Sequence, residues 1–276
     1  MRVDAHQHFW RYDASDASFD WITVEMDAIR RSFTPADLEP ELALHGFDGA
    51  VLVQVAEAPE ENRFLLELAR AHSTVLGVVG WVDLCAEDVG EKLDELVLEP
   101  KFKGVRRIVQ AEPAEIMLDP AFQRGIAALG PRGLGYDILI YWPQLPEAIE
   151  LVRRFPEQRF VVDHVAKPPI EKAETEPWAT NMRELSRQPN VWCKLSGLVT
   201  EADVRAWKPD HLKPYLDVVF EAFSPSRLMF GSDWPVCLLA GSYADVYRVV
   251  DDYTAGLGEG ERSQLFGGTA AEFYRL

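Results

Sequence analysis

Eight short runs of β-branched and other apolar residues recur along this chain, and a segment with helical periodicity follows each of them. Nearly continuous apolar strands that alternate with helices are typical of a parallel sheet covered on both faces. Eight such units predict a closed (β/α)8 barrel of the α/β class, a TIM barrel, as a single domain over residues 1–276. The expected strands cover residues 3–8, 49–56, 75–83, 102–110, 134–142, 160–166, 190–197 and 227–233.

An open, doubly wound sheet is the alternative arrangement for alternating strands and helices. Such a sheet would be expected to carry a glycine-rich turn after its first strand. His8, Phe9 and Trp10 stand at that position instead. The closed barrel is therefore the preferred interpretation.

The connection from Phe9 to Phe33 is unusually long for a barrel of this kind. It contains several aromatic residues, which argues against disorder. Because it leaves the carboxyl end of the first strand, we expect it to fold over the barrel mouth as a partial lid. The alternative is an ordered excursion that covers only the barrel surface.

The composition excludes several classes of partner. The chain has 276 residues and a formal net charge of −17, so nucleic acids and anionic membranes are not expected to bind it. No apolar run reaches the length of a membrane span, and the polar N-terminus does not resemble a signal peptide. Cys85, Cys193 and Cys237 form no CxxC motif, which favours reduced thiols in a cytoplasmic protein.

Polar residues at the predicted strand ends are the candidates for chemistry, because active sites of such barrels lie at the carboxyl ends of the strands. Ionisable groups are rarely buried without partners. Each of these residues has a structural explanation on its own, but their convergence on one end of the barrel indicates an active site. They are His6, His8, Gln54, Arg106, Tyr141, Trp142, His164, Lys194 and Asp233.

The alternation of side chains along a strand helps to choose among these candidates. His6 and His8 should point to one face, roughly 6–7 Å apart along the backbone. On the sixth run His164 shares a face with Val162 and Ala166, and on the eighth run Asp233 shares a face with Gly231. The same reasoning favours Arg106 over Arg107 on the fourth run.

Two kinds of chemistry are open to this set of residues. Two or three imidazoles and one carboxylate can bind a zinc ion with an open position for water. Such an ion lowers the pKa of its water to about 7 and polarises a carbonyl. Without a metal, a carboxylate or imidazole can deprotonate water directly while an arginine or lysine stabilises the oxyanion.

Six stretches resemble a known family when they are taken together and in order. They are VDAHQHFW, FTPADL, GVRRIVQ, FVVDHVAKP, VWCKLSGL and MFGSDWP. The His-x-His pair on the first strand and the aspartate that ends the eighth resemble the amidohydrolase superfamily. Within it, the stretches are similar to the amidohydrolase-related (amidohydrolase-2) branch, and specifically to its sugar lactonases, the group that includes L-fuconolactonases and L-rhamnonolactonases.

The resemblance implies a (β/α)8 barrel and a hydrolase that opens the lactone ring of a small sugar acid. It implies Asp233 as the general base, with His6, His8 and His164 as further catalytic residues. Arg106 would hold the substrate, and the remaining candidates for substrate binding are Gln54, Lys194, Tyr141 and Trp142.

The sequence departs from metal-dependent members of the superfamily at two strands. Tyr141 and Trp142 stand where a histidine is usual on the fifth strand, and the fourth strand offers an arginine in place of a bridging lysine. This argues against a binuclear centre. We expect at most a single divalent ion, Zn2+ or a similar metal, and its requirement is open. Its ligands would be His6, His8, His164 and Asp233.

Two other functions compete with lactone hydrolysis. One is the non-oxidative decarboxylation of an aromatic acid, a reaction that also occurs in this branch. The other is a catalytically silent barrel that only binds sugar acids. The basic residues at the mouth favour a polyhydroxylated substrate, and the combination of the histidine pair with His164 and Asp233 disfavours a silent protein.

Overall fold

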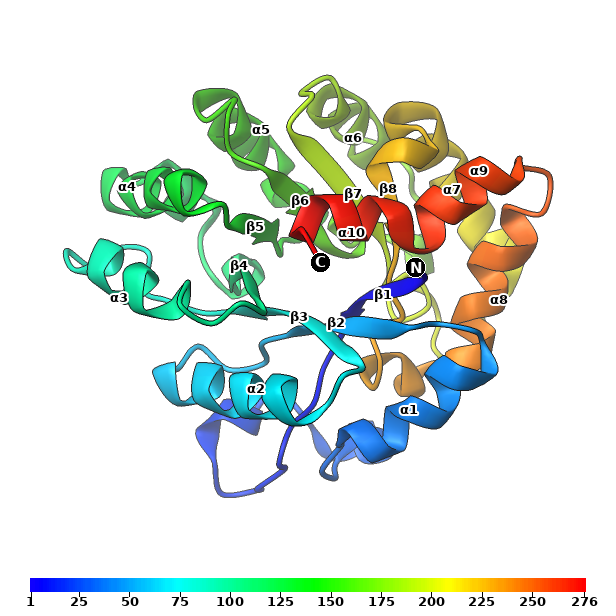
Figure 1. The fold of residues 1–276 in the computed structure, drawn as a ribbon. Coiled ribbons are helices and arrows are strands. Elements are labelled where there is room, and N and C mark those ends of the chain that lie inside the picture. Colours follow the sequence, from blue (N-terminus) through cyan, green and yellow to red (C-terminus); the bar gives the residue numbers. More distant parts are fainter.

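The structure, a computed structural model, describes residues 1–276 and confirms the predicted (β/α)8 barrel. Eight parallel strands form one sheet in sequential order, and the helices between them surround it (Figure 1). The strands are β1 (Val3–Gln7), β2 (Gly49–Val53), β3 (Val75–Gly80), β4 (Phe102–Arg107), β5 (Gly135–Ile138), β6 (Phe160–Val162), β7 (Val191–Leu195) and β8 (Leu228–Phe230).

The helices begin where the sequence supplies suitable first residues. Four of them start with a proline, whose missing N–H is not needed in the first helical turn. None of the helices is both long and apolar enough to cross a membrane. The α-helices are α1 (Pro35–Leu44), α2 (Pro59–Ala71), α3 (Val89–Leu96), α4 (Pro120–Leu129), α5 (Leu145–Arg154), α6 (Trp178–Ser186), α7 (Pro209–Phe223), α8 (Tyr243–Tyr253), α9 (Glu259–Ser263) and α10 (Thr269–Tyr274).

The barrel closes between β1 and the segment that follows β8. The backbone N–H of Asp233 donates to the carbonyl of His6 at 2.9 Å, and the N–H of His8 donates to the carbonyl of Trp234 at 2.7 Å. Both bonds lie at the carboxyl end of the barrel. The contacts that close the sheet therefore also bring the first and last candidate residues of the chain together.

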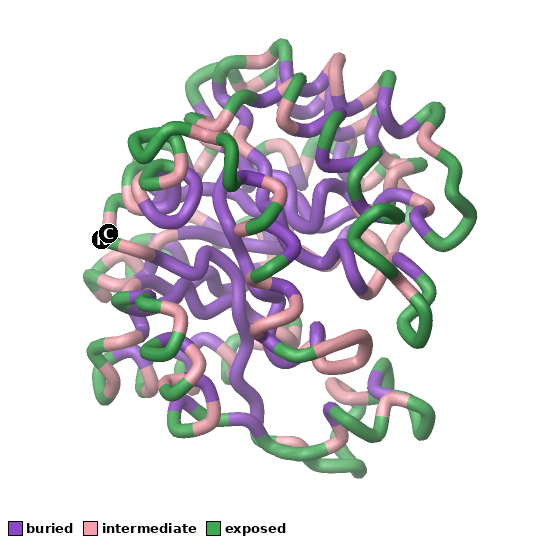
Figure 2. Tube along the Cα trace, turned by 90° about the vertical axis from the view of Figure 1, so that its right-hand side faces the viewer, coloured by how far each residue is buried: buried purple, intermediate pink, exposed green.

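Apolar side chains form two layers, one inside the barrel and one between the barrel and its helices. The inner layer includes Val3, Val51, Val161 and Met229, and the outer layer is much larger. Figure 2 shows the buried segments gathered in the interior and the exposed ones at the periphery. Helix α10 lies across the end of the barrel opposite the candidate site, and its Tyr274 belongs to the inner layer.

The long connection after β1 is ordered by its aromatic residues. Trp10 and Phe33 pair as an isolated antiparallel bridge, and both are almost fully buried. The Phe33 ring also packs edge-to-face on Trp234, just after Asp233, with centroids 5.1 Å apart. The connection is therefore anchored to the loop after β8. Its role as a lid stays a prediction.

All eight strands end earlier than the sequence predicted, by one to four residues, and three of them bear on the site. The apolar runs predicted ends at residues 142, 166 and 233, whereas β5, β6 and β8 end at Ile138, Val162 and Phe230. Most of the residues that directly follow these three strands remain buried after the chain leaves the sheet, so their composition still resembles that of a strand. This correction changes which side chains can reach the site.

Candidate active site

A bulge in β1 turns His6 into the barrel. The register between β1 and β2 advances from Asp4 opposite Ala50 to Gln7 opposite Leu52, so β1 contains one extra residue. Asp4 points away from the barrel interior and accepts from the hydroxyl of Tyr243 on α8 at 3.2 Å. His6, two residues later, faces interior groups. Simple alternation would have placed it on the same side as Asp4.

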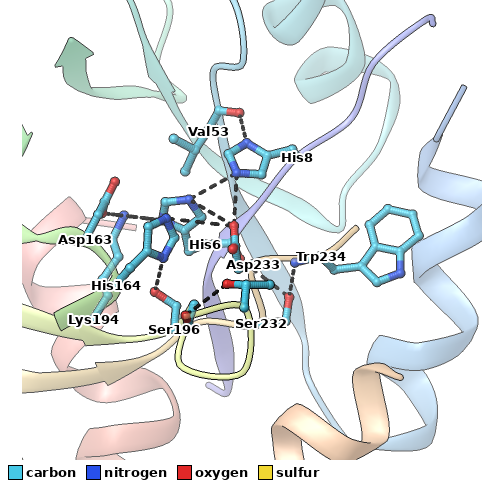
Figure 3. A network of polar contacts seen from close by, with 12 residues as sticks. His6, His8, Val53, Asp163, His164, Lys194, Ser196, Ser232, Asp233 and Trp234 are labelled. Carbon is cyan, nitrogen blue, oxygen red and sulfur yellow. Dashed lines mark hydrogen bonds and ion pairs between the residues drawn. The ribbon is translucent and has the colours of Figure 1, made fainter. Parts of the chain in front are cut away.

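The imidazoles of His6 and His8 converge, as the sequence predicted. Their Nε2 atoms lie 3.2 Å apart (Figure 3). Nδ1 of His8 lies 2.8 Å from the carbonyl oxygen of Val53. Because a carbonyl only accepts, this nitrogen carries the proton, and Nε2 of a neutral His8 ring offers a lone pair.

The carboxylate of Asp233 faces three imidazoles. Its Oδ1 lies 3.3 Å from Nε2 of His8, 3.8 Å from Nε2 of His6 and 3.9 Å from Nε2 of His164 (Figure 3). All four side chains are almost completely buried. Asp233 has a φ of 57°, in the left-handed region that non-glycine residues rarely adopt. The barrel-closing hydrogen bonds to His6 and His8 hold the backbone in this conformation.

The protonation states follow from burial and from these neighbours. Burial lowers the pKa of His164 to about 4, although the Asp233 carboxylate acts in the opposite direction. Burial also lowers the pKa of His6 well below its usual value, and the Lys194 ammonium adds to this effect. Burial by itself would raise the pKa of Asp233, but the three imidazoles outweigh it and lower that pKa. Near neutral pH the site therefore contains an ionised Asp233 beside neutral rings of His6 and His164.

His164 reaches the site through an unusual backbone segment, not through strand alternation. Residues 164–167 all have positive φ angles, and they follow β6 directly. The predicted alternation over 160–166 is therefore wrong, because the strand has already ended. Asp163 and His164 both enter the interior as a result. Nδ1 of His164 lies 2.9 Å from the hydroxyl of Ser196.

Lys194 lies beneath His6, in the floor of the site. Its ammonium is 2.9 Å from Asp163, 2.5 Å from Asp137 and 3.1 Å from Nδ1 of His6. The lysine and both aspartates are completely buried. This placement favours a role in holding His6 over direct contact with a substrate.

Arg106 points into the barrel, while Arg107 pairs with Glu112 outside it. Nη1 of Arg106 lies 3.0 Å from Asp163 and 3.2 Å from Nε2 of His6. Its Nη2 donates to the backbone carbonyl of Gln54. The Gln54 amide in turn donates to the carbonyl of Arg106 at 3.2 Å. The guanidinium is therefore largely occupied by the protein, and Gln54 supports it.

The remaining two candidates follow β5 at the mouth. Tyr141 is 43% exposed, and its ring centroid lies 5.2 Å from the ammonium of Lys167. Trp142 is half-buried and begins the short 3-10 helix Trp142–Gln144. Both lie beyond the end of β5, in the loop where barrel enzymes carry their binding residues.

Sequence reasoning missed three acidic residues around this site. Asp163 is next to His164, and the alternation argument excluded it. Asp137 is the single charged residue in an apolar run, which by itself signals a buried and partnered group. Glu201 lies in the loop after β7 and has no motif around it. For Glu201 the sequence offers no signal.

The cluster fits a single metal ion. One ligand atom each from His6, His8 and Asp233 lie within 4.8 Å of one another, and so do those of His6, Asp163 and His164. Ligand atoms of a tetrahedral zinc ion, bound at about 2.0–2.1 Å, are about 3.3 Å apart. The His6–His8 and His8–Asp233 spacings, 3.2 and 3.3 Å, are of this size, and the His6–Asp233 spacing is 3.8 Å.

The buried charges of the site also favour a cation. Three carboxylates, Asp137, Asp163 and Asp233, face two basic side chains, Arg106 and Lys194. Burial raises the pKa of Asp137 to about 6, so it too is largely ionised near neutral pH. Neutral imidazoles therefore leave a net negative site.

The fold and the site define a barrel enzyme whose polar groups meet at the carboxyl ends of β1, β6 and β8. The chain belongs to the amidohydrolase family, whose model matches residues 3–276. An L-fucono-1,5-lactonase from Burkholderia ambifaria is 41% identical over 100% of this chain and 96% of the relative. An L-rhamnono-gamma-lactonase from Scheffersomyces stipitis is 26% identical over 63% of this chain and 59% of the relative.

A solved structure is also similar over the whole chain. It is the crystal structure of an amidohydrolase from Burkholderia multivorans with bound zinc, with a TM-score of 0.96 and 40% identity. The alignment covers 100% of this chain and 99% of that one. The predicted family and its lactonase relatives are thus confirmed.

Proposed function

We propose that this protein hydrolyses the lactone ring of a sugar acid, with a 1,5-lactone such as L-fucono-1,5-lactone as the first substrate to test. The observation that carries the proposal is the ionised Asp233 carboxylate, buried against three imidazoles at the mouth of an amidohydrolase barrel. The lactonase named among the relatives supports the substrate class.

In the proposed reaction Asp233 accepts a proton from water while the water oxygen bonds to the lactone carbonyl carbon. The carbonyl oxygen becomes an alkoxide. The bond from the carbonyl carbon to the ring oxygen then breaks, and Asp233 returns the proton to that oxygen. The product is the open-chain hydroxy acid.

The other residues prepare the site for this charge movement. The Ser196 hydroxyl can donate to Nδ1 of His164, which leaves the proton of that ring on Nε2, facing Asp233. Arg106 and Lys194 add fixed positive charge beneath the reacting centre, where little water screens it. Both cations also lie against the His6 ring, and the single lone pair of that neutral ring accepts from one of them. They therefore stabilise the alkoxide through their field while they orient an imidazole.

Replacement of Asp233 tests the general base. We expect Asp233→Asn to lower kcat/KM for sugar 1,5-lactones by about 10²–10⁴-fold, the usual contribution of a positioned general base. Exposed Asp252 on α8 provides a control, and Asp252→Asn should leave kcat/KM unchanged. A loss of only a few-fold in the Asp233 variant would show that another group removes the proton.

A zinc ion is proposed as the metal of this site. His6, His8 and Asp233 would hold it, with His164 beside them. When bound, zinc would polarise the carbonyl and lower the pKa of water.

We expect metal-free protein to take up one zinc ion per chain and His8→Asn protein to take up none, as measured by metal analysis after dialysis. Zinc uptake that His8→Asn leaves unchanged would reject the site, and rates before and after chelation measure the dependence of turnover on the ion.

The competing decarboxylase function is separated by its product. A panel of sugar lactones and aromatic carboxylic acids should give acid release from the lactones and no CO2 from the aromatic acids. Tight binding of lactones without turnover would instead support the silent barrel.

A further inference from the structure

Three consecutive loops bring a cation, a carboxylate and an aromatic ring together at the barrel mouth. Tyr141 follows β5, Lys167 follows β6 and Glu201 follows β7. The ammonium of Lys167 lies 3.7 Å from Oε1 of Glu201 and 5.2 Å from the ring centroid of Tyr141. Loops at this end of such barrels carry the residues that bind substrates.

The side chains of Lys167 and Glu201 are largely enclosed, and the protein offers their polar atoms no hydrogen bond within 3.5 Å. Their side chains are only 17% and 20% exposed, and their one mutual contact is longer than a hydrogen bond. Similarly enclosed groups elsewhere in the chain have close partners. Glu61 accepts from the N–H of Val55 at 2.9 Å, and Lys101 donates to the carbonyl of Ala69 at 2.6 Å.

The hydrogen-bonding capacity of these partly exposed groups is therefore open to water or to a ligand at the mouth. The ammonium of Lys167 offers three donors, and the carboxylate of Glu201 accepts only. Lys167 follows His164 by three residues. Burial raises the pKa of Glu201, the Lys167 ammonium lowers it and the Asp233 carboxylate raises it. The pair therefore lies at the same end of the barrel as His164, in the loops after β6 and β7.

We propose that Lys167, Glu201 and Tyr141 form a hydroxyl-binding wall that selects polyhydroxylated lactones over lactones without hydroxyl groups. Glu201 accepts hydrogen bonds from sugar hydroxyls, and Lys167 donates to hydroxyl oxygens. The Tyr141 ring offers an apolar face to the C–H groups of the sugar. The proposal rests on the proposed function and names the part of the substrate that this site recognises.

The test compares two lactones that share the reacting group and differ in hydroxyl groups. L-fucono-1,5-lactone carries hydroxyls on its ring, and δ-valerolactone carries none. We expect Glu201→Gln and Lys167→Met each to lower kcat/KM for the sugar lactone by about 10- to 100-fold, the effect of losing a hydrogen bond to a charged group. For δ-valerolactone the change should stay within about threefold.

Matched controls exist in the loop between β6 and α6. Glu174 and Lys172 are exposed there, and Glu174→Gln and Lys172→Met should change neither rate. Thermal unfolding of each variant identifies any that fails to fold, in which case the other variant decides. Equal losses on both lactones would indicate that the pair only holds two loops together, and no loss on either would exclude a role in binding. Both results would overturn the proposal.

Binding of the ring-opened sugar acid separates this proposal from the proposed function. Calorimetry with L-fuconate needs no turnover. One outcome is that the wild-type protein hydrolyses no lactone but binds L-fuconate, and that the two variants bind it at least about 10-fold more weakly. This outcome would support the hydroxyl-binding wall and reject the proposed reaction. If the wild-type protein neither turns over the lactone nor binds the acid, both proposals fail.

Discussion

At the scale of single residues, the position of His164 depends on the absence of a side chain at Gly197. Gly197 has a φ of +64°, and a Cβ built there would lie 2.7 Å from Cγ of the His164 ring. Real Cβ atoms do not approach that closely, so any larger residue must displace the ring. The imidazole can face Asp233 only because the residue of the loop after β7 that lies against it, Gly197, has no side chain.

We therefore expect Gly197→Ala to lower kcat/KM by about 10²-fold, because a displacement near 1 Å is enough to spoil a reacting geometry. The free energy of unfolding should fall by about 1–3 kcal/mol, from overpacking and from the left-handed backbone. Gly256→Ala is the control, since a Cβ there meets nothing within 4 Å. Full activity of Gly197→Ala with unchanged stability would show that the His164 ring is not confined as described.

Site residues were predicted more successfully from their ionisable side chains than from the alternation of side chains along a strand. His6, His8, His164 and Asp233 meet in one cluster because ionisable groups in a barrel interior need one another. The route to each side chain was less predictable. His6 depends on a bulge in β1, and His164 and Asp233 depend on left-handed backbone. Long-range contacts decide these features, and no local pattern reveals them.

At the scale of elements, the number and order of strands were predictable and their ends were not. Parallel strands that are buried on both faces produce apolar runs, and all eight runs contain a strand. The loops after β6 and β8 are nearly as apolar and as buried as the strands themselves, with Val165, Ala166 and Trp234 among their residues. Composition therefore could not mark the points where the chain leaves the sheet and begins to build the site.

The connection after β1 shows a second limit at this scale. Three of its apolar residues, Trp10, Ile29 and Phe33, are almost fully buried. The direction in which it packs depends on Trp234, which is some 200 residues away in the sequence. A local pattern indicates that such a segment is buried, but it does not identify the surface that buries it.

At the scale of the whole molecule, the last helix connects the closed end of the barrel to the floor of the site. Tyr274 of α10 donates to Oδ2 of Asp137 at 2.8 Å, and the same carboxylate pairs with Lys194. Lys194 in turn contacts His6. A continuous chain of polar contacts therefore runs from the C-terminal helix to the reacting centre, through an otherwise apolar barrel interior.

Removal of the Tyr274 hydroxyl should weaken the protein in a manner that depends on pH. Burial raises the pKa of Asp137 to about 6, and the hydroxyl opposes this because it donates to the carboxylate. In Tyr274→Phe that pKa should rise further above its value in the unfolded chain. Ionisation of Asp137 then destabilises the native state of the variant more than that of the wild type. The loss in the free energy of unfolding should therefore grow as the pH rises through about 6, and reach about 1.5–3 kcal/mol.

Urea unfolding of wild-type and Tyr274→Phe protein at about pH 5 and about pH 8 measures this difference. Tyr253 provides the matched control, because its hydroxyl donates to Asp217 at 2.8 Å on the surface. Tyr253→Phe should cost little and show no comparable rise with pH, since solvent replaces the lost donor. If the cost of Tyr274→Phe is the same at both pH values, then the ionisation of Asp137 does not change in this range and its pKa is not near 6. A large cost at both pH values would mean that the carboxylate is ionised throughout beside Lys194. A small cost at both would mean that it stays protonated, so that the electrostatic argument for a bound cation would lose its excess carboxylate.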